Sequence, residues 1–158
     1  MTDKKNKTQK QKSLSGQKIR VGTNKGLKKY KNLNFLERYA LFMGVSQILE
    51  INLKNLLVDK YEYDINKIEK WTMGKTCSEL EQNKLRPDFI LLLKSVVDYR
   101  NYIAHELLAN KFLMHSLLED KIPENHYDKE SRRLDKAIIE LEQLFFLFTW
   151  TDENNGWT

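Results

Sequence analysis

Hydrophobic residues recur every three or four positions through much of the chain, which is the period of an amphipathic helix. The first run predicts a helix over residues 35–59, and Asn34 followed by Glu37 forms a capping-box pattern at its start. The apolar positions of this run are Phe35, Leu36, Tyr39, Ala40, Phe42, Met43, Ile48, Leu49, Leu53, Leu56 and Leu57.

A second long helix is expected from Pro87 to about Lys111. Proline suits the first helical position, and Asp88 suits the positive end of the helix dipole. Residues 112–118 could continue this helix after a bend, and Pro123 should end any helix that precedes it.

The third long helix should start at about Asp128 or Ser131 and run to Phe148. Its apolar residues form one stripe, which we expect to be buried. They are Leu134, Ile138, Leu141, Leu144, Phe145 and Phe148.

Shorter elements fill the stretch between the first two helices. Residues 61–73 mix polar and aromatic side chains and predict an irregular crossing, which Gly74 ends. Thr76 with Glu79 suggests a capping box that opens a short helix to about Asn83. With no strand pattern in competition, residues 33–150 predict an all-α antiparallel bundle of three long helices plus one or two short ones.

The N-terminal segment differs from this bundle in charge. Residues 1–32 carry eleven lysines and arginines against one acid, Asp3, which leaves the remainder of the chain net acidic. With few apolar residues, the segment predicts a disordered basic arm. Residues 151–158 are expected to be a polar C-terminal tail.

Three roles suit the arm. It could hold RNA through phosphate contacts that weaken with salt, remain a solvated tail, or dock onto the acidic body of a neighbouring subunit. The cations available for RNA are Lys18, Arg20, Lys25, Lys28, Lys29 and Lys31.

Length and composition indicate a single soluble domain. At 158 residues the chain can bury one sizeable core, and its one cysteine, Cys77, excludes an internal disulfide framework. No leader pattern is evident, and the longest dense apolar patch, residues 144–150, is far shorter than the ~20 residues of a membrane helix. We therefore expect a cytoplasmic protein without a membrane partner.

The clearest chemical signal is the string Arg100-Asn101-Tyr102-Ile103-Ala104-His105 within the second long helix. Arginine binds phosphate through its planar fork, and histidine exchanges protons near neutral pH, so the pair suits phosphodiester cleavage. The same pair would also occur by chance as a surface cation and a hydrogen-bonded histidine.

Helix geometry separates the two side chains. Arg100 falls within the apolar stripe, whereas His105 lies about 140° away on the polar stripe with Asn101. The reach of arginine, a local widening of the helix, or a second subunit could bring a complete site together. A structural alternative is an ion pair between Arg100 and Glu50.

The string resembles the signature of the HEPN superfamily, in which an arginine, a polar residue that is often asparagine, and a histidine occupy these places. Arg100, Asn101 and His105 match them. The resemblance implies a helical bundle, toxin or defence ribonuclease activity, and a homodimer whose paired motifs line one cleft. It also implies an antitoxin or regulatory partner, although Leu107 stands where some relatives carry a modified tyrosine.

The mechanism we expect is metal-independent cleavage of single-stranded RNA, with no cofactor. His105 would act as general acid or base, Arg100 would stabilise phosphoryl charge, and Asn101 would orient the phosphate or His105. His105-Glu106 begins like a zinc-protease helix, but Ala109 replaces the second histidine. The alternative function is a non-catalytic helical module that binds a protein or RNA partner.

Overall fold

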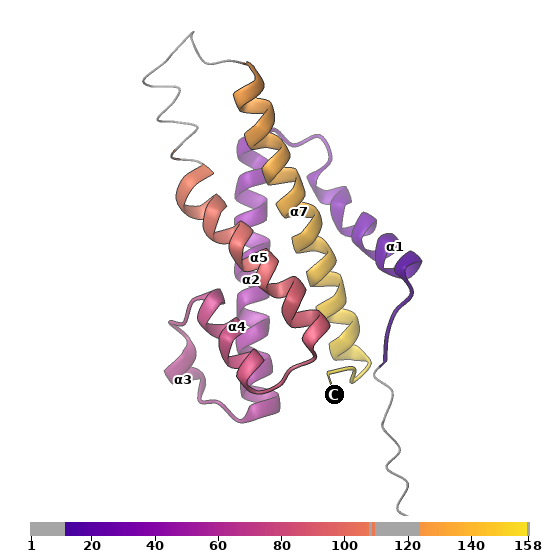
Figure 1. Ribbon diagram of the computed structural model, residues 1–158, viewed down its shortest axis with the longest axis vertical. Coiled ribbons are helices and arrows are strands. Elements are labelled where there is room, and N and C mark those ends of the chain that lie inside the picture. Colours follow the sequence, from indigo (N-terminus) through magenta and orange to yellow (C-terminus); the bar gives the residue numbers. More distant parts are fainter. Residues whose placement is uncertain (1–11, 108, 110–123, 158) are drawn as a thin grey trace, which may run out of the picture.

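A computed structural model describes residues 12–107, 109 and 124–157, and this part of the chain contains helices and no strand. Figure 1 shows the long helices α2 and α7 running side by side, with α5 crossing them and α1 against α7. The all-α helical bundle is therefore confirmed. The elements are α1 (Gly16–Leu27), a 3₁₀ turn (Lys28–Tyr30), α2 (Phe35–Tyr61), α3 (Ile65–Ile68), α4 (Met73–Gln82), α5 (Pro87–Tyr102), a π-helix (Ile103–Leu107) and α7 (Glu124–Glu153).

Helix α2 forms as its sequence pattern predicts. The Asn34 side chain accepts a hydrogen bond from the Glu37 backbone N–H at 2.9 Å, and its amide donates to Glu37 Oε1 at 2.8 Å. The first of these bonds satisfies a backbone donor that a helix start otherwise leaves unpaired. Four leucines of the predicted run, Leu49, Leu53, Leu56 and Leu57, are buried and form the centre of the core. Leu36 and Ile48 of the same run are exposed.

The short elements after α2 begin earlier than their sequence suggested. Asp64 caps α3 within the stretch expected to be irregular. Thr72, and not Thr76, caps α4, since its side chain accepts a hydrogen bond from the Lys75 backbone. Thr76 is buried one turn inside the helix, where its hydroxyl donates to the Thr72 carbonyl at 2.9 Å. Two threonines at one-turn spacing made the cap ambiguous.

The prediction of a disordered arm over residues 1–32 is wrong for residues 16–30, and residues 1–11 lie outside the described part. Helix α1 packs along α7, and Ser15 caps its start. A Cβ atom on Gly22 would lie 2.3 Å from the Phe146 ring, and one on Gly26 would lie 2.5 Å from Glu142. Only glycine permits this approach, so a segment with few apolar side chains packs through its backbone.

A buried carboxylate fastens the end of this segment. Glu142 Oε1 accepts a hydrogen bond from the Tyr30 hydroxyl at 2.8 Å and forms an ion pair with Lys29 Nζ at 2.5 Å. Burial, followed by the neighbouring Glu142 charge, raises the pKa of Tyr30, so the phenol stays protonated as a donor. The two donors stabilise a charge that would otherwise be costly to bury.

The C-terminal residues also belong to the bundle, and the predicted polar tail over residues 151–158 is wrong for residues 151–157. Helix α7 continues to Glu153, and the chain turns at Asn155, where φ is 49°. Trp157 then packs edge-on against Phe89, with 4.9 Å between ring centroids, and its indole donates to Asp152. One large aromatic side chain is enough to fold the tail back.

Among the described helices, α2 alone has the length and apolar content that a membrane span requires. Its buried leucines face the rest of the bundle, and the core helix of a soluble protein passes the same test. The helix is therefore compatible with a soluble protein.

Candidate functional site

The backbone changes form inside the motif. Helix α5 ends at Tyr102, and the next turn, Ile103–Leu107, is a π-helix that contains His105. Hydrogen bonds in a π-helix span one residue more than in an α-helix, so the turn is wider. The local widening that the sequence allowed between Arg100 and His105 is therefore present, and it reduces the angle between them.

The two motif side chains have different environments. Arg100 is half-buried, whereas Asn101 and His105 are exposed. The neighbouring apolar residues Ile103 and Leu107 are fully buried and hold the wide turn against the core. One chain thus exposes the imidazole of His105 to solvent, with the arginine set further back.

The alternative ion pair between Arg100 and Glu50 is not formed. Glu50 instead accepts from Lys54 Nζ at 3.0 Å, and the same ammonium donates to the Glu69 carbonyl. The Arg100 side chain makes no hydrogen bond or ion pair with any residue that the structure describes. Lys54 sits one turn after Glu50 on the same helix, and this local partner satisfies the carboxylate.

Beside the motif, α5 and α7 enclose a groove of about 660 Å³. Its lining residues are Ser95, Asp98, Tyr99, Tyr102, Arg133 and Lys136. The Tyr102 hydroxyl donates to the buried Glu130 at 2.9 Å and accepts from Arg133 Nη1 at 2.5 Å. The Arg133 guanidinium carbon also lies 4.8 Å from the centre of the Tyr102 ring.

Burial and the hydrogen bond to Glu130 raise the pKa of Tyr102. The sequence analysis missed this cluster, because Tyr102 and Glu130 are separated by 28 residues and nothing in their spacing pairs them. The one available signal was the position of Tyr102 inside the motif itself.

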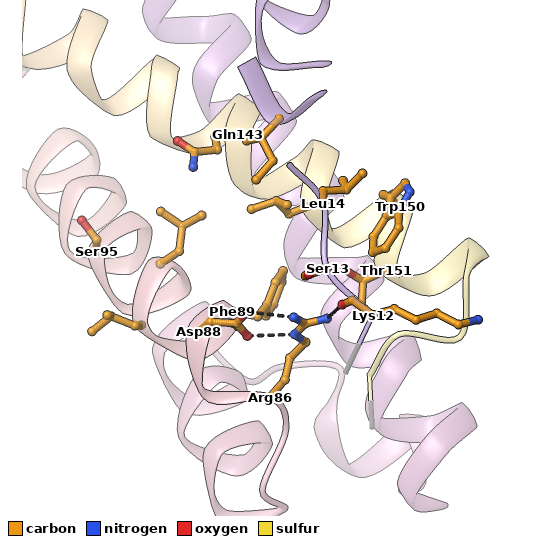
Figure 2. Close-up of a pocket in the computed structure, with 14 residues that line it drawn as sticks. Lys12, Ser13, Leu14, Arg86, Asp88, Phe89, Ser95, Gln143, Trp150 and Thr151 are labelled. Atoms are coloured by element: carbon orange, nitrogen blue, oxygen red, sulfur yellow. Dashed lines mark hydrogen bonds and ion pairs between the residues drawn. The ribbon is translucent and has the colours of Figure 1, made fainter. Parts of the chain in front are cut away.

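A second cavity, of about 390 Å³, lies at the other end of α5, between the residues before α1 and the end of α7. Figure 2 shows Arg86 at its edge, with Nε and Nη2 of the guanidinium on Asp88. Arg86 donates to the two carboxylate oxygens of Asp88, each at 2.8 Å, to the Lys12 carbonyl at 2.8 Å and to the Gly156 carbonyl at 2.9 Å. These four bonds join three segments of the chain.

The cations predicted for an RNA-binding arm now lie on and after α1. Lys18, Arg20, Lys25, Lys28 and Lys31 are exposed. Lys29 is engaged by the buried Glu142 at 2.5 Å. Lys29 is therefore a structural cation, and the others leave a basic surface on α1.

Among the residues that the structure describes, the other reactive groups form no second site. Cys77 is buried, and burial raises the pKa of its thiol to about 11, so little thiolate forms near neutral pH. Within residues 12–107 and 124–157, no group of three or more His, Cys, Asp or Glu side chains is arranged to hold a metal ion.

The comparisons with known proteins give no match: no family model, no curated protein and no solved structure matches this chain.

Proposed function

We propose that this protein is a metal-independent endoribonuclease of the toxin or defence type, which cleaves single-stranded RNA through Arg100 and His105. The observation that carries the proposal is the π-helix at Ile103–Leu107, which widens the helix within the motif. Single π-turns inside α-helices are frequent at functional sites. The resemblance of Arg100, Asn101 and His105 to the HEPN signature supports the same chemistry.

In the proposed reaction, His105 accepts the proton of the ribose 2′-hydroxyl as the 2′-oxygen bonds to phosphorus. The bond from phosphorus to the 5′-oxygen breaks, and a second acid protonates that oxygen. The products are a 2′,3′-cyclic phosphate and a 5′-hydroxyl. The exposure of His105 suits this role, since the imidazole has to reach the RNA backbone.

Arg100 stabilises the charge that develops on the phosphoryl oxygens. Its side chain has no ion-pair partner in the described part of the chain, so its charge remains available to a phosphate. Asn101 is exposed four residues before His105 and orients the phosphate or the imidazole.

The active form in this proposal is a homodimer. Arg100 is set back and His105 is exposed, so one chain does not present both groups on one open surface. A two-fold contact between the motif-bearing ends of two α5 helices supplies a second copy of each group, and the opposing His105 is the second acid. An antitoxin or regulatory protein would then silence the site in the cytoplasm.

The test is cleavage of a labelled single-stranded RNA by the purified protein in EDTA, beside His105→Ala prepared in the same way. We expect cutting by the wild type alone, with products that end in cyclic phosphate. The same RNA with one 2′-deoxyribose at the cleavage position should resist at that bond. Cleavage that EDTA abolishes, or equal cutting of DNA, would refute the mechanism.

A second candidate function is a non-catalytic interaction module, favoured by apolar residues on the outer face of α2. Ile48 and Ile51 are 52% and 57% exposed, and Leu36 lies on the same helix at 48%. Expression separates the two functions. A ribonuclease should arrest growth unless His105 is replaced, whereas a module should leave growth unchanged in both cases.

A further inference from the structure

Four cations form one stripe along the N-terminal half of α7. Lys129, Arg132, Arg133 and Lys136 are spaced by three, one and three residues, which places them on one side of a helix. Lys129, Arg132 and Lys136 are exposed, and the Arg133 side chain is 43% exposed. With a rise of 1.5 Å per residue, the stripe is about 10 Å long.

Arg133 is the one member of this stripe with a described carboxylate partner, since 4.0 Å separates its Nη1 from Glu130 Oε1. The nearby Asp135 pairs with Arg38 from α2. Lys129, Arg132 and Lys136 form no ion pair with any residue in the described ranges. These three cations therefore present unpaired positive charge.

Two cations of the stripe, Arg133 and Lys136, reach the groove of about 660 Å³ between α7 and α5. Arg133 and Lys136 line one wall, and Tyr99 and Tyr102 line the other. Asp98 is the single carboxylate among the lining residues. A groove with cations along one side and aromatic rings on the other is suited to a single nucleic acid strand, because phosphates meet the cations and bases stack on the rings.

The other half of α7 has no comparable surface. Helix α1 covers it, with Gly22 against Phe146 and Gly26 against Glu142. The uncovered half is the one beside the motif, since Tyr102 of α5 bonds directly to Glu130 and Arg133 of α7. His105 follows Tyr102 by three residues, in the π-helix.

We propose that this groove binds the backbone of single-stranded RNA, with phosphates along Lys129, Arg132 and Lys136 and a base against Tyr99. The strand then leads toward His105, an assignment that rests on the proposed ribonuclease function. Arg133 holds the aromatic wall in position through its contacts with Tyr102 and Glu130. Binding itself does not depend on cleavage and is measured separately.

The experiment measures binding of a labelled single-stranded RNA that carries 2′-O-methyl groups and so lacks the attacking hydroxyl. The stripe variant is Lys129→Gln with Arg132→Gln and Lys136→Gln. We expect its affinity to fall at least tenfold at moderate salt. The slope of log affinity against log salt should decrease in magnitude by about 2, since each phosphate contact on a single strand contributes about 0.7.

The matched control removes the same charge away from α7, as Lys67→Gln with Lys70→Gln and Lys84→Gln, three exposed lysines that form no ion pair with a described residue. Its affinity should stay within about threefold of the wild type. An equal loss in both variants would assign the effect to net charge and overturn the proposal. Wild-type protein that binds no RNA, or that binds polyglutamate as tightly, would also overturn it.

One further variant separates this inference from the proposed function. His105→Ala should bind the methylated RNA as the wild type does. If the stripe variant loses binding while the wild type cuts no unmodified RNA, the groove is an RNA site and the ribonuclease proposal fails. If the wild type cuts RNA and the stripe variant binds and cuts equally well, the groove assignment fails alone.

Discussion

Two arginines at opposite ends of the same helix have opposite surroundings. Arg86, just before α5, is 7% exposed and donates to Asp88 and to the carbonyls of Lys12 and Gly156. Arg100, near the end of α5, is half-buried, and its side chain has no partner in the described ranges. Four of the five guanidinium donors of Arg86 are used within the fold, which indicates a structural role. The unpaired guanidinium of Arg100 fits the phosphate contact proposed for it.

The largest effect should come from Arg100→Ala, in RNA cleavage. Loss of the group that stabilises transition-state charge should lower the cleavage rate about 10³-fold. The free energy of unfolding should change by less than about 1 kcal/mol, because no described pairing is lost. Single-turnover cleavage and urea denaturation measure the two quantities. Arg100→Lys is the control and should retain part of the rate, since the charge stays but the fork is lost.

Arg86→Ala should give the opposite result. Its loss leaves the carbonyls of Lys12 and Gly156 without their donor, so we expect the free energy of unfolding to fall by about 2–3 kcal/mol. Cleavage per folded molecule should stay unchanged. Urea denaturation checks this result beside Arg20→Ala, which removes an exposed arginine from α1. Equal stability of the two variants would contradict the structural role.

The smallest effect concerns pH at the Arg86 end. The Arg86 guanidinium lowers the pKa of Asp88, so this pair stabilises the fold above the ordinary pKa of the carboxyl. That stability is lost as pH falls through the lowered value, below about pH 4. Since the Asp88 side chain is 66% exposed, the contribution should stay below about 1 kcal/mol.

Denaturation of the wild type and Asp88→Asn at pH 7 and pH 3 measures this contribution. The stability difference between them should shrink at the lower pH. If the stability difference between the wild type and Asp88→Asn were the same at pH 7 and pH 3, the ionised Asp88 carboxylate would not contribute to the stability that the Arg86 contacts provide.

The long helices could be predicted because their signals are local. Asn34 and Glu37 lie within one turn of each other, and Pro87 needs no distant partner to start α5. The apolar stripe of α7 could be predicted for the same reason. Leu134, Leu141 and Leu144 are fully buried, as the helical period of their positions implied.

The segments that the sequence analysis misjudged depend on distant contacts. Helix α1 packs through Gly22 and Gly26, which a composition argument counts as flexible residues. Trp157 folds the C-terminal end back onto Phe89, which is 68 positions away in the chain. Neither partner can be identified from local spacing, so both ends were expected to lie outside the bundle.

The candidate site also contains a part that could be predicted from local sequence and a part that could not. Arg100 and His105 could be singled out, because residue type and spacing carry their chemistry. The groove could not be predicted, since Tyr102 meets Arg133 only after α5 and α7 have packed. Whether the widened turn forms also depends on burial of Ile103 and Leu107 against the core.

The bond between Tyr30 and Glu142 also has a practical consequence for where the protein can be shortened. A fragment that starts at Asn34 keeps every long helix, yet it removes both donors of a buried carboxylate and uncovers Phe146. Such a fragment would be prone to aggregate and would lose much of its stability for reasons unrelated to catalysis. The smallest fragment that retains the fold therefore begins before Ser15, and affinity tags belong upstream of that residue.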